Sequence, residues 1–255
     1  MILAVDIGNT NAVIGAFEGE KLLFLSRIST DRQKMRDDYA VTLKSIVSLY
    51  GFSISDIEGA IVSSVVPPVS SNMVSAIEKI CPDIQVMQVG PGIKTGLNIK
   101  IDNPAQTGAD LVCVSVAAIK KYPLPSIVID MGTATSITAL DKDGNFLGGS
   151  IIPGVRISLE ALSSRAAQLP QISLSDKATL IGKNTVDAMR SGTIIATASM
   201  LDGMILRYRE VLGNNLTVIL TGGMGKTVVD YCKEEIIYDE NLLLDGLRLL
   251  YEKNK

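Results

Sequence analysis

Two short stretches of the sequence share an aspartate, a glycine and side chains that carry hydroxyl or amide groups. They are Asp6-Ile7-Gly8-Asn9-Thr10-Asn11 and Asp130-Met131-Gly132-Thr133-Ala134-Thr135. Glycine lets backbone N–H groups approach a phosphate closely, and Thr and Asn side chains donate further hydrogen bonds. Aspartate repels phosphate, but it can hold a divalent cation, or water bound to one, that bridges two phosphates. Two such turns facing each other across a cleft would therefore bind a nucleoside triphosphate.

An ordinary hairpin turn is the alternative for either stretch alone, because aspartate often hydrogen-bonds to the backbone of its own turn. Both stretches, however, stand in matching contexts. Each follows an apolar run, at 2–5 and 127–129, and each precedes a β-prone run, at 12–17 and 136–140. The repetition predicts two hairpins of common origin and favours the phosphate-binding interpretation.

The composition predicts a globular protein that acts on a small molecule. Of the 255 residues, 47% are hydrophobic and 20% charged, which suits well-filled cores and a soluble surface. The net charge of −3 argues against a nucleic-acid partner, because phosphate backbones require clustered Lys and Arg. We find no signal-peptide pattern and no apolar run of membrane-spanning length, so we expect a cytoplasmic protein without a membrane partner.

The cysteine and histidine counts limit which residues could form disulfides, bind a metal or act as a general base. Cys81, Cys113 and Cys232 are far apart in apolar or helix-like contexts, which indicates buried thiols in a reducing compartment rather than disulfides or metal ligands. The chain has no histidine. A general base acting near neutral pH must therefore be a carboxylate, a lysine or a cysteine.

The first half is predicted to form an antiparallel meander followed by alternating helices and strands. The expected strands are three within 2–28, then 59–63 and 84–89, with helices at 37–50 and 69–80. A loop over 91–106 leads to Thr107-Gly108-Ala109-Asp110 and a helix over 111–122. Asp110 would lie in the first turn of that helix, where the helix dipole alone could explain a carboxylate. Ser63 and Ser64 either line a cleft or simply end a strand.

The second half repeats this plan after Pro123 and Pro125, which mark the predicted boundary between domains 1–122 and 123–255. The expected strands are 126–129, 136–140, 146–152 and 216–220, and the expected helices are 154–167, 186–212 and 241–252. Gly148-Gly149 allows close approach of a ligand or a backbone, or marks a β-bulge. Thr221-Gly222-Gly223 is a weak signal of nucleotide contact. Arg190, Arg207 and Arg209 are expected on the solvated side of the long helix.

This arrangement resembles the fold shared by acetate and sugar kinases, actin and the heat-shock chaperone ATPases. The resemblance implies an α/β chain of two ribonuclease H-like (actin-like ATPase) domains, each a mixed five-stranded sheet with helices, and a cleft between them. Within that superfamily the sequence resembles type III pantothenate kinase from the first strand to the last helix. The motifs that carry this resemblance are Asp6-Ile7-Gly8-Asn9-Thr10, Thr107-Gly108-Ala109-Asp110, Asp130-Met131-Gly132-Thr133-Ala134-Thr135, Gly148-Gly149-Ser150-Ile151-Ile152-Pro153-Gly154 and Asn184-Thr185.

The resemblance implies transfer of the ATP γ-phosphoryl to the primary hydroxyl of pantothenate, which gives 4'-phosphopantothenate in the first step of coenzyme A biosynthesis. Asp110 matches the general base of the family. Asp6 matches the residue that positions Mg²⁺ or a similar divalent ion, and Asp130 matches the ligand of K⁺ or NH₄⁺. The implied ATP-binding residues are Asp6, Ile7, Gly8, Asn9, Thr10, Asn11, Ala12, Val13 and Thr133. The implied pantothenate-binding residues are Ile101, Gly108, Ala109, Asp110, Leu111 and Thr185. The family acts as a homodimer whose active site draws on both subunits.

Two positions depart from the family pattern. Leu111 replaces the usual arginine and Ile101 the usual tyrosine, so neither can donate the hydrogen bonds of the residue it replaces. The loop offers Asn98, Asp102 or Asn103 as substitutes, and Arg165 is a further candidate to reach a neighbouring active site.

Other functions remain open. One alternative is a kinase of the same fold that acts on another small alcohol. A second is a non-catalytic nucleotide-binding regulatory protein, although both Asp turns and Asp110 argue against it. A chaperone-like ATPase is disfavoured by the chain length.

Overall fold

The structure is a computed structural model that describes residues 1–255, and its contacts divide the chain into two compact units. Unit 1 comprises 1–96, 103–117 and 242–255, and unit 2 comprises 97–102 and 118–241. The last helix thus belongs to unit 1, although the sequence suggested that it would fold with the second half. The division into folding domains 1–122 and 123–255 stays a prediction, as does the cleft between them.

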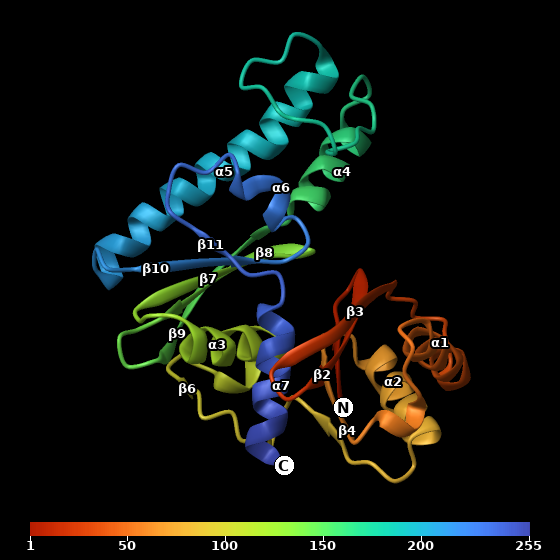
Figure 1. Ribbon diagram of the computed structural model, residues 1–255. Coiled ribbons are helices and arrows are strands. Elements are labelled where there is room, and N and C mark those ends of the chain that lie inside the picture. Colours follow the sequence, from red (N-terminus) through yellow and green to blue (C-terminus); the bar gives the residue numbers. More distant parts are fainter. The chain divides into compact units, whose positions relative to one another are not determined.

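Unit 1 contains a five-stranded mixed sheet with the strand order β3-β2-β1-β4-β5. The central strand β1 pairs antiparallel with β2 and parallel with β4. Helices α1 and α2 pack against each other and cover one face of the sheet, while α7 lies along β1 and β4 (Figure 1). The bounds are β1 Ile2–Ile7, β2 Asn11–Glu18, β3 Lys21–Ser29, β4 Gly59–Ser64, β5 Val86–Gln88, α1 Arg36–Leu49, α2 Pro67–Ile80 and α7 Leu242–Asn254. Helix α3, Ala109–Lys121, belongs to unit 1 up to residue 117.

Unit 2 repeats the strand order of unit 1, since its sheet runs β11-β10-β7-β8-β9-β6. The central strand β7 again pairs antiparallel with the next strand and parallel with a later one, β10. This match agrees with the duplication predicted from the two Asp turns. The bounds are β6 Asn98–Ile99, β7 Ser126–Met131, β8 Ala134–Leu140, β9 Asn145–Pro153, β10 Thr217–Thr221, β11 Ile237–Tyr238, α4 Val155–Arg165, α5 Thr185–Leu212 and α6 Gly225–Val229.

Side chains alternate along β1, and this alternation decides which of them face helices α1 and α2 and which face α7. Leu3, Val5 and Ile7 belong to the hydrophobic cluster that includes α1 and α2. Successive side chains of a strand point to opposite faces, so Ala4 and Asp6 point to the face on which α7 packs. The one acidic residue of β1 is thereby kept out of the apolar cluster.

Three local predictions differ from the structure. Helix α2 begins at Pro67 rather than Val69, because a proline at the first helical positions lacks only an N–H that would have no partner there. Strand β5 is shorter than predicted. The predicted loop over 91–106 contains the short strand β6, which pairs with β9 and gives the second sheet its sixth strand.

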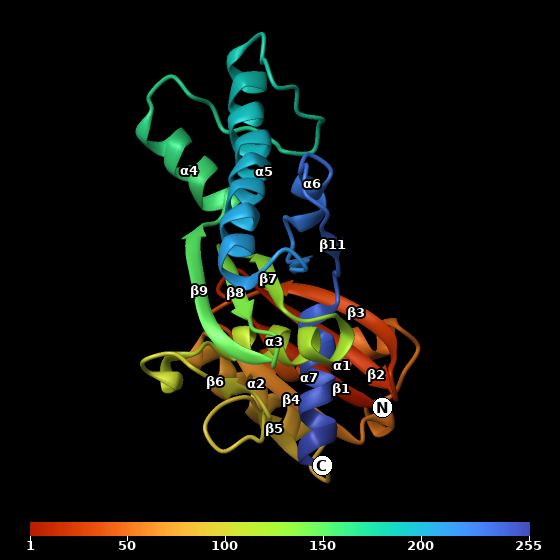
Figure 2. The ribbon, with the colours of Figure 1, turned by 90° about the vertical axis from the view of Figure 1, so that its left-hand side faces the viewer.

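Strand β9 contains an irregularity that explains its two glycines. Pairing with β8 shifts register between Ala139 and Leu140, where Leu147 is the extra residue of a β-bulge, and the strand is strongly curved (Figure 2). Gly148 has φ of 108°, which favours glycine, and a Cβ on Gly149 would lie 1.8 Å from the carbonyl oxygen of Ile137. Both the bulge and the close backbone approach therefore apply here.

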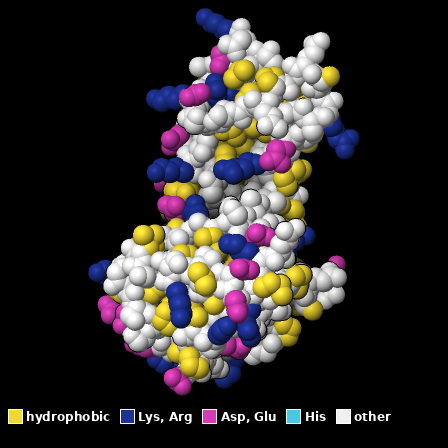
Figure 3. Space-filling view, turned by 90° about the vertical axis from the view of Figure 1, so that its right-hand side faces the viewer, with side chains coloured by type: hydrophobic (Ala, Val, Ile, Leu, Met, Phe, Trp, Pro, Cys, Tyr) yellow, Lys and Arg dark blue, Asp and Glu magenta, His cyan; other side chains and the backbone are white.

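The surface carries no single-sign patch on the face shown in Figure 3, where basic and acidic side chains are intermixed. No helix combines the length and the apolar composition that crossing a bilayer requires.

We predict that Gly149→Ala lowers the free energy of unfolding by about 1–3 kcal/mol, because backbone atoms must shift to admit the methyl group. Gly203→Ala on α5 is the matched control. A Cβ there meets no atom within 4 Å, so replacing a helical glycine should stabilise the protein by about 0.5–1 kcal/mol. Urea denaturation of both variants measures the two effects, and a Gly149→Ala protein as stable as the wild type would contradict the prediction.

Candidate active site

The first Asp turn joins β1 to β2 and is braced by the segment after β3. Within the turn, the Gly8 N–H donates to the Asn11 carbonyl at 3.0 Å. From outside, the Thr30 hydroxyl donates to the Gly8 carbonyl at 2.7 Å and the Thr30 N–H to the Thr10 carbonyl at 2.9 Å. Asn9, Thr10 and Asn11 remain exposed. The turn is thus fixed at its base, while its tip is open to a ligand.

A polar cluster lies on the α7-facing side of sheet 1, where β1 and β4 end. Asp6 and Ser63 are direct neighbours in the register of these strands, so their side chains point to the same face. Ser63 is fully buried and its hydroxyl makes no hydrogen bond of ordinary geometry, but it lies close enough to Cys113 of α3 to lower the pKa of that thiol. Cys113 stands three residues after Asp110 on the same helix, which places strand and helix residues in one cluster.

The electrostatics of Cys113 show that both carboxylates act on this cluster. Burial raises the pKa of the thiol well above its ordinary value. The carboxylates of Asp6 and Asp110 raise the pKa further, because a thiolate beside two negative charges is disfavoured. Cys113 is therefore a neutral thiol and an unsuitable general base, and the charges of both carboxylates act on it.

Asp110 lies in the first turn of α3, as predicted, and is half-buried. Its Oδ1 accepts a hydrogen bond from the Leu111 N–H at 2.8 Å, so the carboxylate does stabilise the helix start. A Cβ on Gly108 would lie 2.3 Å from the same oxygen. Glycine at 108 thus leaves room for the carboxylate in this position.

Close contacts with helix α7 fix the position of α3 in unit 1. A Cβ on Gly246 would lie only 2.0 Å from the Cys113 carbonyl oxygen, so the two helix backbones are in contact. Because Asp110 lies one turn before this contact, its backbone is held relative to the sheet that carries Asp6.

The second Asp turn joins β7 to β8 in unit 2 and is surrounded by glycines from two other segments. Gly222, with φ of 93°, approaches so closely that a Cβ would lie 2.5 Å from Asp130 Oδ1. A Cβ on Gly154 would lie 2.1 Å from the Thr133 carbonyl oxygen. The Met224 N–H also donates to the Met131 carbonyl at 3.3 Å. The Gly-Gly turn after β10 and the start of α4 therefore meet at this hairpin, and carbonyl oxygens accompany the Asp130 carboxylate.

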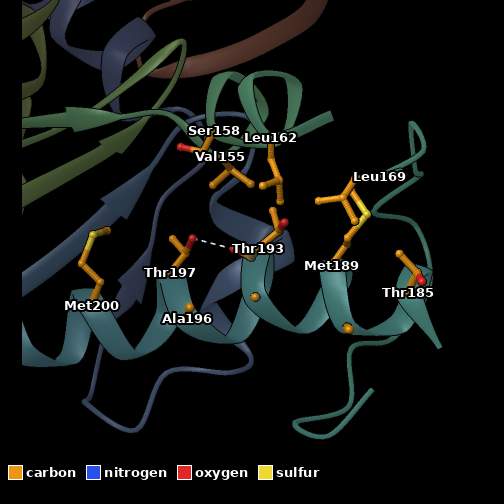
Figure 4. A pocket seen from close by; sticks show the side chains of 12 residues that line it. Val155, Ser158, Leu162, Leu169, Thr185, Met189, Thr193, Ala196, Thr197 and Met200 are labelled. Atoms are coloured by element: carbon orange, nitrogen blue, oxygen red, sulfur yellow. Dashed lines mark hydrogen bonds between the residues drawn. The ribbon is translucent and has the colours of Figure 1, made fainter. Parts of the chain in front are cut away.

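Thr185 is the first residue of α5 and lines a groove between α4 and α5 (Figure 4). The groove has a volume of about 620 Å³. Apolar side chains predominate, with hydroxyl groups among them; the lining residues are Val155, Ser158, Leu162, Leu169, Thr185, Ala188, Met189, Gly192, Thr193, Ala196, Thr197 and Met200.

The expectation that Arg190 faces solvent is wrong. This side chain is 9% exposed and donates to Asp176 and Asp187, each at 2.9 Å. The Ser191 hydroxyl donates to the Leu180 carbonyl at 2.7 Å, and Asn184 caps α5 by accepting from the Asp187 N–H. Two ion pairs and two hydrogen bonds thus fold the segment before α5 onto the helix and fix Thr185. A sequence pattern could not reveal this, since Asp176 lies far from Arg190 along the chain.

The residues that depart from the family pattern lie in different units. Leu111 is half-buried in the first turn of α3 in unit 1, and Ile101 belongs to unit 2, where it contacts Gly148. Asn98 donates to Asn145 at 2.6 Å and is therefore engaged within the sheet, whereas Asp102 and Asn103 are exposed.

Apart from Ile101, the predicted site residues lie at the two Asp turns and at the starts of helices α3 and α5. Asp6 and Ile7 end β1, the next three residues form the first turn, and Asn11 to Val13 begin β2. Gly108 precedes α3, which begins at Ala109. Asp130 lies near the end of β7, Thr133 lies in the second turn, and Thr185 opens α5. The residues that sequence reasoning missed are Cys113, Thr30 and Gly246. Each acts through a contact with a distant segment, so the sequence carried no signal for it.

Comparison with known proteins identifies the family. Residues 2–207 match the family described as Type III pantothenate kinase. A protein named Type III pantothenate kinase from Bacillus cytotoxicus is 44% identical over 100% of this chain and 97% of its own length. Another of that name, from an Exiguobacterium species, is 43% identical with both chains covered completely.

The similarity to solved structures concerns the fold and not the function. Component A of (R)-2-hydroxyglutaryl-CoA dehydratase from Acidaminococcus fermentans has a TM-score of 0.56 at 16% identity, covering 98% of this chain and 96% of that one. The ROK hexokinase from Thermus thermophilus has a TM-score of 0.54 at 10% identity, and the match covers 100% of this chain and 99% of the hexokinase. These likenesses confirm the predicted sugar-kinase and actin-like fold. Together with the relatives that match along its whole length, they leave one assignment: the chain belongs to the type III pantothenate kinase family.

Proposed function

We propose that this protein transfers the γ-phosphoryl group of ATP to the primary hydroxyl of pantothenate, giving 4'-phosphopantothenate for coenzyme A synthesis. The observation that carries the proposal is the polar cluster of unit 1, where Asp6 and Asp110 both act on Cys113. One carboxylate at a phosphate-binding turn and another at an open helix start are the two acidic groups that such a transfer uses.

The first turn binds the triphosphate in this proposal. Its exposed tip supplies backbone N–H groups and the side chains of Asn9 and Thr10, and its braced base limits their movement. Asp6 would hold a divalent ion, Mg²⁺ or one like it. Mg²⁺ is commonly bound by one carboxylate together with phosphate oxygens, and the ion would supply charge neutralisation for the transferred group.

Asp110 accepts the proton of the substrate hydroxyl. The hydroxyl oxygen forms a bond to the γ-phosphorus while the bond from that phosphorus to the β–γ bridging oxygen breaks, and ADP leaves. Since the transition state is loose, the proton is transferred late, and such general-base help contributes about 10²–10⁴-fold. The other nearby group that could ionise, the Cys113 thiol, is held neutral by burial.

The second turn contributes Thr133 as a phosphate contact and Asp130 as a ligand of a monovalent cation, K⁺ or NH₄⁺. The donor set supports this role, because a carboxylate and the backbone carbonyls of the tight turn lie close together. Pantothenate binds through Gly108, Ala109, Leu111, Ile101 and Thr185. Leu111 offers an apolar contact where the family usually has arginine.

We also propose a homodimer. The α4–α5 groove is largely apolar, and Leu162 in its lining is exposed. Ile157 on α4 and Val186 on α5 are exposed as well. Burying such a surface against a second copy would be favourable, and it would bring Thr185 to a subunit interface.

The direct test is ATP consumption by the purified protein with and without pantothenate, in sodium and then in potassium buffer. Pantothenate-dependent ADP formation is expected. A panel of other small alcohols tests the alternative of a same-fold kinase with a different acceptor. ATP binding without turnover on any of them would favour a regulatory protein instead.

We predict that Asp110→Asn lowers kcat by about 10²–10⁴-fold, because asparagine cannot accept the proton, while binding of ATP and pantothenate changes little. Steady-state kinetics and calorimetric binding measure the two effects separately. Asp83→Asn removes an exposed carboxylate that lies in none of the predicted site motifs and serves as the control. Turnover retained in Asp110→Asn would remove this residue from the mechanism.

We predict that Asp130→Asn weakens the activation by potassium, since a neutral amide binds a monovalent cation less well than a carboxylate. The rate should rise with potassium only at higher concentrations than for the wild type. A titration of initial rate against KCl at constant ionic strength measures this, and an unchanged midpoint would exclude the role.

A mixing experiment tests the shared active site. Asp110→Asn and Thr185→Arg should each be inactive alone, but each heterodimer would contain one intact site. After subunit exchange of an equal mixture, activity should recover to roughly a quarter of the wild-type value, because half of the dimers are mixed. No recovery despite exchange, shown by mass spectrometry, would contradict a site built from two subunits.

A further inference from the structure

The phosphate-binding stretches contain no cationic side chain. Neither Asp turn, nor the Gly-Ala-Asp start of α3, nor the Gly-Gly turn after β10 contains lysine or arginine. A triphosphate retains negative charge even with a divalent ion bound, and phosphate sites commonly add Arg or Lys. This raises the question of which cation lies near the first turn.

Arg32 lies beside this turn. Its guanidinium donates to the Asn9 side-chain oxygen at 3.3 Å, and it forms no ion pair with a carboxylate. Arg36, four residues later at the start of α1, is different, because it pairs with Asp37 at 3.0 Å. Arg32 is therefore a cation that contacts the phosphate turn and still has donors available for an anion.

The segment that carries Arg32 is anchored on both sides. Thr30 makes its two hydrogen bonds to the first turn, and the fully buried Tyr39 of α1 donates its hydroxyl to the Asp31 carbonyl at 2.8 Å. The Asp31 carboxylate accepts from the Gln33 N–H at 2.9 Å. A backbone fixed before and after position 32 limits the region that this side chain can reach.

The contact also determines how Asn9 is oriented. A guanidinium only donates hydrogen bonds, so Asn9 must present its amide oxygen to Arg32. The amide NH₂ of Asn9 is then left to donate elsewhere, and phosphate oxygens are suitable acceptors for it.

We propose that Arg32 is a further ATP-binding residue, which contacts the phosphates bound at the first turn and orients the Asn9 amide toward them. This inference rests on the proposed function only in placing ATP at that turn. It concerns binding, so it can be tested without pantothenate.

The test compares Arg32→Gln with Arg36→Gln, which removes the same charge from an exposed site nearby that does not contact the turn. Calorimetry measures the Kd of each variant for Mg-ATP and for AMP. We expect Arg32→Gln to raise the Kd for Mg-ATP by about tenfold, the size of a charge-assisted contact, and to leave the Kd for AMP within about twofold. Arg36→Gln should change neither.

Two results would overturn the inference. One is an unchanged Kd for Mg-ATP in Arg32→Gln, and the other is an equal loss for AMP, which would indicate a general effect on the nucleoside site or the fold. In steady-state kinetics, the KM for ATP should rise and the KM for pantothenate should not. A wild type that binds Mg-ATP but fails to phosphorylate pantothenate would refute the proposed function alone, and the Arg32 comparison would still be decided by binding.

Discussion

The packing of helix α3 on the α7-facing side of sheet 1 is the constraint on which the site of unit 1 depends. Asp6 and Ser63 share that face because β1 and β4 pair in register, and Cys113 brings the helix against them. Gly246 permits the backbone of α7 to touch that of α3. Without this contact, the carboxylate at the strand end and the carboxylate at the helix start would have no fixed relation to each other.

The two Asp turns occupy equivalent places in sheets of the same strand order, yet their surroundings differ. Hydrogen bonds from Thr30 brace the first turn from one side and leave its tip open. The second turn is packed by glycine backbones from the β10–α6 turn and the start of α4. A duplicated scaffold thus carries two chemically distinct sites, one suited to phosphate groups and one in which a carboxylate is close to backbone carbonyls.

In unit 2, a buried arginine holds the segment that precedes α5. Arg190 is nearly inaccessible, whereas its partners Asp176 and Asp187 are 69% and 38% exposed, so the guanidinium is the buried charge that these two pairs compensate. Its partners lie on either side of the segment that leads to Thr185. The order of this segment therefore depends on electrostatics, whereas the groove that Thr185 lines is mainly apolar.

Local patterns in the sequence determined most of the elements, both Asp turns, the start of α3 at Asp110 and the cap of α5 at Asn184, because alternation, helical period and turn chemistry involve neighbouring residues. Resemblance in motif order determined the family. Only the tertiary structure decided that α7 returns to unit 1, that Cys113 feels the charge of both carboxylates, that Arg190 is buried and that Arg32 contacts Asn9. Each of these depends on segments that are distant along the chain, and no local pattern specifies which of them meet when the chain folds.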